Sequence, residues 1–279
     1  MGSFVALFSS LLWGSADFFA GLLAKRYRAL AVTGASQAFG LLFGVVVIAF
    51  SGNFIRPTLA MDGYFLPGIF AGIAGFIGLS AFYTGLATGR MGVVSPISSL
   101  SVIIPLVVAL AQGEKPNRLQ IFGIAVAIIG AFLASGPEIR GGFPIRPLVF
   151  AVIAALSFGT ALSFLAVGSR TDALHTMVAM RCGSVTIAIA LALRYRTLGG
   201  FQRTVIPQLF FIGVADFLGN FFLGIATTKG LVSVAMVLGS LFPIVTALLA
   251  YRLLHERLHK SQYVGIVVAI LGIISISIA

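Results

Sequence analysis

Three ionisable side chains and one amide interrupt stretches of sequence that are otherwise almost entirely apolar. They are Asp17, Arg181, Asp216 and Asn220. An ionised group in hydrocarbon costs roughly 2.5–3.5 kcal/mol even on a lenient insertion scale, so such groups pair with one another or face a water-filled path. Asp17 and Asp216 could therefore bind a cationic or amino-group ligand, or carry a coupling proton. The alternative is a purely structural pairing, for example with Arg181.

Further polar and aromatic residues recur at helical spacing near these four. Trp13 lies one turn before Asp17, and Asn220 lies one turn after Asp216, so each pair shares a helix face. Trp13 could instead serve ordinary packing, Tyr83 could lie at a membrane interface, and the long stem of Arg181 could reach a surface. The full set of candidate cavity residues is Trp13, Asp17, Tyr83, Ser95, Ser98, Ser99, Arg181, Asp216, Asn220 and Ser240, with Asp17 and Asp216 as the candidate proton carriers.

A second pattern, His255-Glu256-Arg257-Leu258-His259, has the H-E-x-x-H spacing of zinc proteases. The corresponding segment earlier in the chain keeps its glutamate, Glu114, and has neither histidine. No acidic residue follows the motif to act as a third ligand. The sequence therefore predicts no metal site and no cofactor, although an intramembrane zinc protease stays an open alternative.

The elements that must carry these residues are long apolar helices. Hydrophobic residues make up 59% of the 279 residues, charged residues only 9%, and the mean hydropathy is +1.11. Apolar stretches near 20 residues are long enough to cross a bilayer. We expect an all-α membrane protein with about ten transmembrane helices, the first of them retained, at 3–24, 31–51, 64–88, 92–112, 119–136, 147–168, 173–194, 206–228, 232–254 and 261–278.

The net charge of +11 does not indicate a nucleic-acid binder, because the basic residues are scattered through short loops. If the helices alternate in direction, five basic residues lie at the end that carries both termini. The other end collects Lys25, Arg26, Arg28, Arg90, Arg140, Arg146, Arg194, Arg196, Arg203, Arg252, Arg257 and Lys260. The positive-inside rule would then place both termini outside the cell. The lone cysteine, Cys182, can form no internal disulfide and is expected to pack as a small apolar residue.

The chain also contains an internal repeat. Gly123–Gly130 matches Gly265–Gly272 at an offset of 142, which also pairs Glu114 with Glu256. Upstream, Gly85-Leu-Ala-Thr88 matches Gly224-Ile-Ala-Thr227, and Pro105 matches Pro243. We expect a first five-helix repeat at 1–137, a connecting loop at 138–146 and a second repeat at 147–279. Five is odd, so the second copy must be inverted, an arrangement that recurs in transporters.

Comparing the two copies separates shared features from unshared ones. The glycines and prolines are shared, which favours a scaffold role. In the linear alignment Asp17 corresponds to Leu162, Asp216 to Ile77, Asn220 to Ala81 and Arg181 to Gln37. Polar groups present in one copy alone are the better candidates for function.

These features resemble the drug/metabolite transporter superfamily, specifically its EamA-like ten-helix members. The resemblance rests on Trp13-Gly14, Pro105, Pro243, Glu114 and Glu256 in their duplicated order. It implies a central cavity lined mainly by the first, third, fourth, sixth, eighth and ninth helices, and secondary transport of small metabolites. It also favours termini inside, against the loop charges. One departure is the spacing from proline to glutamate, 9 residues in one copy and 13 in the other.

The sequence thus predicts a secondary transporter or exporter of small metabolites, working by alternating access, and not an enzyme. A non-transporting membrane scaffold is the remaining alternative. The expected location is a cell membrane, the inner membrane of a bacterium. Expected partners are a small-molecule substrate and the lipid bilayer, with no nucleic acid, in a monomer or homodimer.

Overall fold

The computed structural model describes residues 2–88, 94, 97–134, 145–197, 199–253 and 259–278. All the regular secondary structure within these ranges is helical. The first half holds the helices α1 (Gly2–Ala24), α2 (Ala29–Ser51), α3 (Phe65–Thr88), η1 (Leu100–Val102), α5 (Ile103–Ala111) and α6 (Arg118–Ala134). The second half holds α7 (Ile145–Ser169), α8 (Ala173–Tyr195), η2 (Arg203–Val205), α9 (Ile206–Thr228), α10 (Val232–Gly239), α11 (Phe242–Leu253) and α12 (Lys260–Ser277).

These elements confirm the all-helical membrane architecture predicted from hydropathy. Seven of the described helical segments are long and apolar enough to cross a bilayer, and three shorter apolar helices cover 97–111, 118–134 and 260–276. The predicted helix at 232–254 is two helices, α10 and α11, separated at Ser240 and Leu241. Pro243 explains this break, because it has no N–H to continue the hydrogen-bond ladder toward Gly239.

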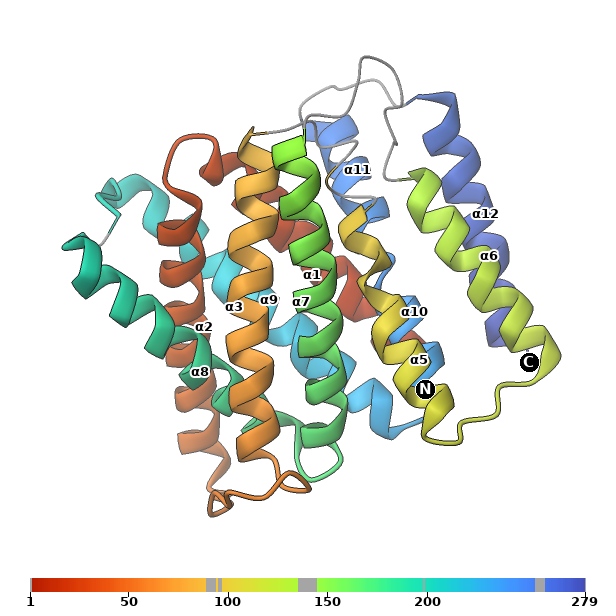
Figure 1. Cartoon of the computed structure of the whole chain (residues 1–279), viewed down its shortest axis with the longest axis horizontal. Coiled ribbons are helices and arrows are strands. Elements are labelled where there is room, and N and C mark those ends of the chain that lie inside the picture. The colour runs from red at the N-terminus through yellow and green to blue at the C-terminus, as the bar shows by residue number, and fades with distance from the viewer. Residues whose placement is uncertain are drawn as a thin grey trace.

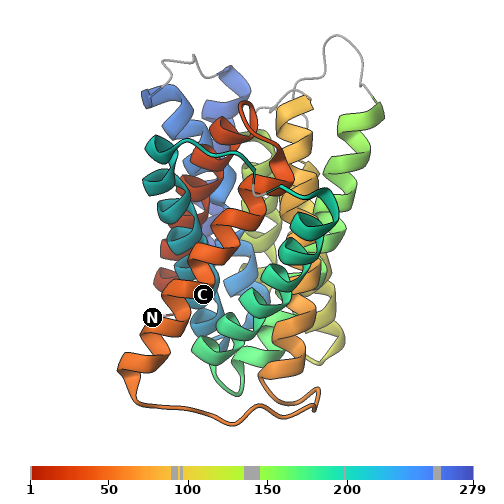
Figure 2. The same ribbon diagram turned by 90° about the vertical axis from the view of Figure 1, so that its left-hand side faces the viewer.

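The helices form a bundle in which both chain ends lie at the same end (Figure 1). The helices α1, α3, α7 and α9 form the centre, through the close pairs α1–α9 and α3–α7. On one flank α6 packs along α12, and on the opposite flank α2 and α8 pack together (Figures 1 and 2). Each α-helix of one half therefore packs mainly against helices of the other half.

Close contacts through glycine show that the two halves pack in equivalent ways. A Cβ on Gly130 would collide with Ala269, and one on Gly272 would collide with Ala127. The two contacts exchange under the same 142-residue offset, as a pseudo-two-fold axis between the halves requires. Small residues permit this close approach where the bilayer supplies no hydrophobic drive between helices.

Candidate functional site

A small central cavity of about 60 Å³ lies between the two halves. Its walls come from α1, η1, α3, α7, α8, α9 and α11, so both repeats contribute. The lining residues are Trp13, Asp17, Gly75, Leu79, Ser101, Phe158, Ala161, Leu162, Met180, Arg181, Asp216, Asn220 and Phe242. The cavity therefore joins three ionisable groups with aromatic and aliphatic side chains.

The packing contacts establish which positions of the two halves are equivalent. Gly78 lies against Phe158, and Gly219 lies against Trp13. In the same manner Gly72 lies against Met180, and Gly213 lies against Ser36. These reciprocal contacts relate α1 to α7 by an offset of 145 residues and α3 to α9 by an offset of 141.

With this register, ten of the lining residues form five equivalent pairs. In four of them a polar residue in one half corresponds to a nonpolar residue in the other, and the fifth pair is aromatic in both halves. The pairs are Trp13 with Phe158, Asp17 with Leu162, Gly75 with Asp216, Leu79 with Asn220, and Ser101 with Phe242. The cavity is symmetric in its backbone and asymmetric in its chemistry.

This register corrects the linear alignment of α3 with α9. Sequence matching paired Asp216 with Ile77, whereas the packing pairs Asp216 with Gly75. Ile77 is 46% exposed on the outer face and does not line the central cavity. The local sequence match of Gly85-Leu-Ala-Thr88 sets an alignment that differs by two residues from the register of the packing contacts.

The prolines Pro105 and Pro243 are likewise not equivalent. Gly159 lies against Ser101 and Ile104, and Gly14 lies against Phe242 and Val245, so an offset of 141 also relates these segments. Pro105 follows Ile104, whereas Pro243 follows Phe242. The prolines therefore stand three residues apart in this register, which accounts for three of the four residues by which the spacings from proline to glutamate differ.

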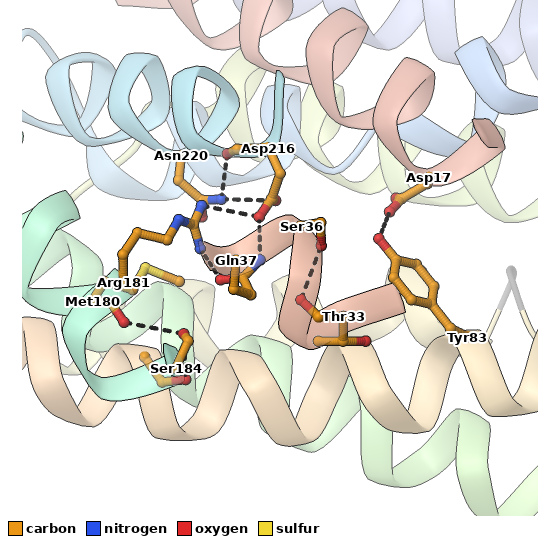
Figure 3. A network of polar contacts seen from close by, with 11 residues as sticks. Asp17, Thr33, Ser36, Gln37, Tyr83, Met180, Arg181, Ser184, Asp216 and Asn220 are labelled. Atoms are coloured by element: carbon orange, nitrogen blue, oxygen red, sulfur yellow. Dashed lines mark hydrogen bonds and ion pairs between the residues drawn. The ribbon is translucent and has the colours of Figure 1, made fainter. Parts of the chain in front are cut away.

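A buried polar network occupies the middle of the bundle (Figure 3). The Asp216 carboxylate forms an ion pair with Arg181, 2.9 Å from Nη2 to Oδ2. The same Oδ2 accepts a 2.9 Å hydrogen bond from Gln37 Nε2, and Asp216 Oδ1 accepts one of 3.1 Å from Asn220 Nδ2. Arg181 Nη1 also donates to Gln37 Oε1, which closes a ring of three side chains.

Gln37 and Arg181 occupy equivalent positions of α2 and α8, 144 residues apart, and they contact each other. Two equivalent positions can meet only beside the pseudo-two-fold axis, so this contact marks the axis. The guanidinium carbon of Arg181 lies 5.9 Å from the centroid of the Phe217 ring, and Arg181 is 1% exposed. Arg181 is therefore held beside the pseudo-two-fold axis by its ion pair and by its contact with the Phe217 ring.

Asp17 lies apart from this ring and has a sparser environment (Figure 3). The phenol of Tyr83 donates to Asp17 Oδ1 across a long 3.4 Å. Within the described ranges no basic side chain forms an ion pair with Asp17, whereas Asp216 has Arg181. When both aspartates are ionised, the cavity thus carries one carboxylate more than its cations balance.

The other predicted cavity residues take different places. Tyr83 is buried and reaches the cavity only through Asp17. Ser98, Ser99 and Ser240 are buried but do not line the cavity, and the Ser240 hydroxyl donates to the carbonyl of Val237. Ser95 lies outside the described residues. Trp13, Asp17, Arg181, Asp216 and Asn220 are the predicted residues that meet at the cavity.

Several lining residues escaped the sequence reasoning, among them Phe158, Leu162, Leu79 and Phe242. They are apolar, so nothing in their type distinguishes them from residues that face lipid. The one available signal was equivalence to a polar residue in the other half, as for Leu162 and Asp17.

The last histidine of the motif, His259, has a structural role at the start of α12. The segment 254–258 lies outside the described residues, but His259 is the N-cap of α12 and forms a capping box with Gln262. Asn117 and Gln120 form the same reciprocal hydrogen bonds in the first half, at 2.8 Å each. Across the described ranges no three His, Cys, Asp or Glu residues gather as a metal site would require.

The repeated glutamate of the first half also has a structural contact. The Glu114 carboxylate accepts hydrogen bonds from the backbone N–H groups of Val232, at 2.6 Å, and Ser233, at 3.0 Å. These are unsatisfied donors of the first turn of α10, which favour a negative charge. Glu114 thus joins the halves at the end that carries the termini.

Comparisons with known proteins agree with this architecture. The profile of the EamA-like transporter family matches residues 1–136 and 145–278. An uncharacterized protein of Methanocaldococcus jannaschii is 24% identical over 132 residues, which span 47% of this chain and 96% of that protein. A crystal structure of another protein superposes on this chain with a TM-score of 0.81 at 12% sequence identity, and the match covers 99% of this chain and 98% of the other. The last likeness shows the fold alone.

Proposed function

This chain belongs to the EamA-like transporter family and is a multi-pass integral membrane protein, and from that premise we propose that it is a secondary transporter of small metabolites working by alternating access. The observation that carries the proposal is the cavity on the pseudo-two-fold axis, built from equivalent positions of two inverted repeats. Two halves with one scaffold can exchange conformations, and the exchange opens the same site to either side.

The size of the cavity supports a contracted state of such a cycle. Sites for small molecules usually measure about 300–1,000 Å³, whereas this cavity measures about 60 Å³. It can hold a few waters but no metabolite. Admission of a substrate would therefore require the central helices to separate, and the Glu114 contact to α10 is one connection that such a motion would break at the terminal end.

The polar groups suggest how the site divides its roles. Asp216 is neutralised by Arg181 and positioned by Gln37 and Asn220. We therefore propose that this ring of side chains orients a polar group of the substrate. Among the described residues, the Asp17 carboxylate accepts one long side-chain hydrogen bond, and it is the better candidate to accept a proton or to bind the amino group of a substrate. Trp13, Phe158 and Phe242 would enclose the apolar part of the substrate.

A flux experiment tests this function. The purified chain is reconstituted into proteoliposomes and screened with radiolabelled metabolites, with and without an imposed pH gradient. Transport of at least one solute, lost in Arg181→Met and retained in the control Ile77→Val on the outer face, is the expected result. Absence of flux for every solute, together with unimpaired cellular function of Asp216→Asn, would instead favour a membrane scaffold.

A further inference from the structure

A large lateral hollow lies between α3, α7 and the flank formed by α2 and α8, away from the central cavity. It measures about 750 Å³ and extends from the start of α2 along the outer face of α3. A second hollow of about 250 Å³ between α2 and α8 shares four of its lining residues, Arg28, Leu30, Phe76 and Leu191. The two hollows thus form one groove on the side of the bundle.

The groove is mainly apolar, with the hydroxyl groups of Ser80, Thr84 and Thr88 along α3, and it is basic at one end. Ile77 and Ile153 line its wall and are 46% and 37% exposed, as expected of a surface that faces lipid chains. Arg28 and Arg146 line the same groove and are exposed. Both arginines lie next to helix starts, at α2 and α7, at the end opposite the termini (Figure 1). This polarity matches an amphiphile with an anionic head and an apolar tail.

Aromatic rings border the same end of the groove. The guanidinium carbon of Arg28 lies 5.6 Å from the ring centroid of Tyr195, and the ring of Tyr27 lies 5.0 Å from that of Phe201. Tyrosine is enriched where membrane proteins cross the headgroup region. These aromatic contacts support a position for Arg28 near the lipid phosphates.

The charge of this end excludes a cationic occupant. Among the described residues, nine basic side chains lie at or next to the helix ends here, and none of the described residues at this end is acidic. The nine are Lys25, Arg26, Arg28, Arg146, Arg194, Arg196, Arg203, Arg252 and Lys260. Basic pockets between transmembrane helices bind the head groups of anionic lipids. We infer that this groove is a binding site for an anionic phospholipid, with its phosphate between Arg28 and Arg146 and its acyl chain along α3. The inference does not depend on which solute the protein carries.

Native mass spectrometry of the full chain in detergent tests the site, with phosphatidylglycerol and phosphatidylcholine as probes. We expect preferential retention of phosphatidylglycerol that is unaffected by inorganic phosphate. The variant R28Q/R146Q should lose roughly 30-fold in relative affinity, about fivefold for each arginine. The control R203Q removes a charge from the same end without touching the groove and should bind as the unmodified chain does.

A substitution in the groove wall distinguishes lipid binding in the groove from attraction by the surface charge of this end. Ala87→Trp places a bulky ring at an exposed lining position and should displace the lipid while both arginines remain. Equal retention of both lipids, an equal loss in R203Q, or displacement by inorganic phosphate would each overturn the proposal. So would a mass shift that corresponds to a second copy of the chain in place of lipid.

Discussion

The two halves of this transporter place different side chains on one scaffold. At the position where the first half has Gln37, the second has Arg181, and where the first has Gly75, the second has Asp216. The reverse holds on the first helix of each half, where Asp17 stands against Leu162. The glycine contacts that position these residues are nevertheless reciprocal.

This difference shows how a duplicated fold can enclose a cavity that is asymmetric in its chemistry. A residue on the pseudo-two-fold axis meets its own equivalent, so two arginines there would repel each other at close range. An arginine opposite a glutamine avoids that repulsion, and Asp216 then neutralises the charge. Symmetry is retained where packing requires it and lost where a charge must be balanced.

The largest loss of stability is expected when Arg181, the cation of the ring, is replaced. Arg181→Met leaves the buried Asp216 carboxylate uncompensated and should reduce the free energy of unfolding by about 3–5 kcal/mol. The equivalent Gln37→Leu removes a neutral partner and should cost about 1–3 kcal/mol. Chemical denaturation in detergent measures both. Equal losses would contradict the asymmetry of the two positions.

The packing shared by the two halves is tested by adding one methyl group at equivalent glycines, one in each half. A Cβ at Gly72 would meet the carbonyl of Met180, and one at Gly213 would meet that of Ser36. Gly72→Ala and Gly213→Ala should each destabilise the protein by about 1–3 kcal/mol through overpacking. Gly230→Ala is the control, because its Cβ would meet no atom within 4 Å. A large difference between the two core variants would argue against equivalent packing.

The repeated glutamates allow a comparison at the helix ends. Glu114→Gln weakens the contact with the first turn of α10 and should cost about 1 kcal/mol of stability. The repeat predicts a similar loss for Glu256→Gln. Thermal unfolding of each variant at neutral pH gives the two values, and a clear loss in Glu114→Gln alone would show that the halves differ here as well.

The smallest effect on stability, with a specific effect on transport, is expected at Asp17. The hydrogen bond that its carboxylate accepts from Tyr83 is long, so Asp17→Asn should leave the unfolding transition nearly unchanged. In proteoliposomes it should abolish the response of flux to a pH gradient. Asp216→Asn should instead weaken substrate binding and keep that response. The opposite assignment of the two phenotypes would make Asp216 the proton carrier.

Much of the fold could be predicted from the sequence because a bilayer imposes simple rules on helix length and polarity. The position of Asp17, Arg181, Asp216 and Asn220 around one cavity also agrees with the cost of polar groups in hydrocarbon. The serines were less informative, since a serine can satisfy its hydroxyl on its own helix, as Ser240 does with Val237. Apolar lining residues such as Phe158 carried no signal of their own.

The sequence by itself determined that the chain spans a membrane, that it is built from two inverted copies, and which polar residues are unshared. The tertiary structure alone decided the register in which the copies correspond. That register depends on contacts between helices far apart in the chain, such as Gly219 with Trp13, which no linear match contains. It also decided that Gln37 and Arg181 meet, because only packing about the pseudo-two-fold axis brings equivalent positions together.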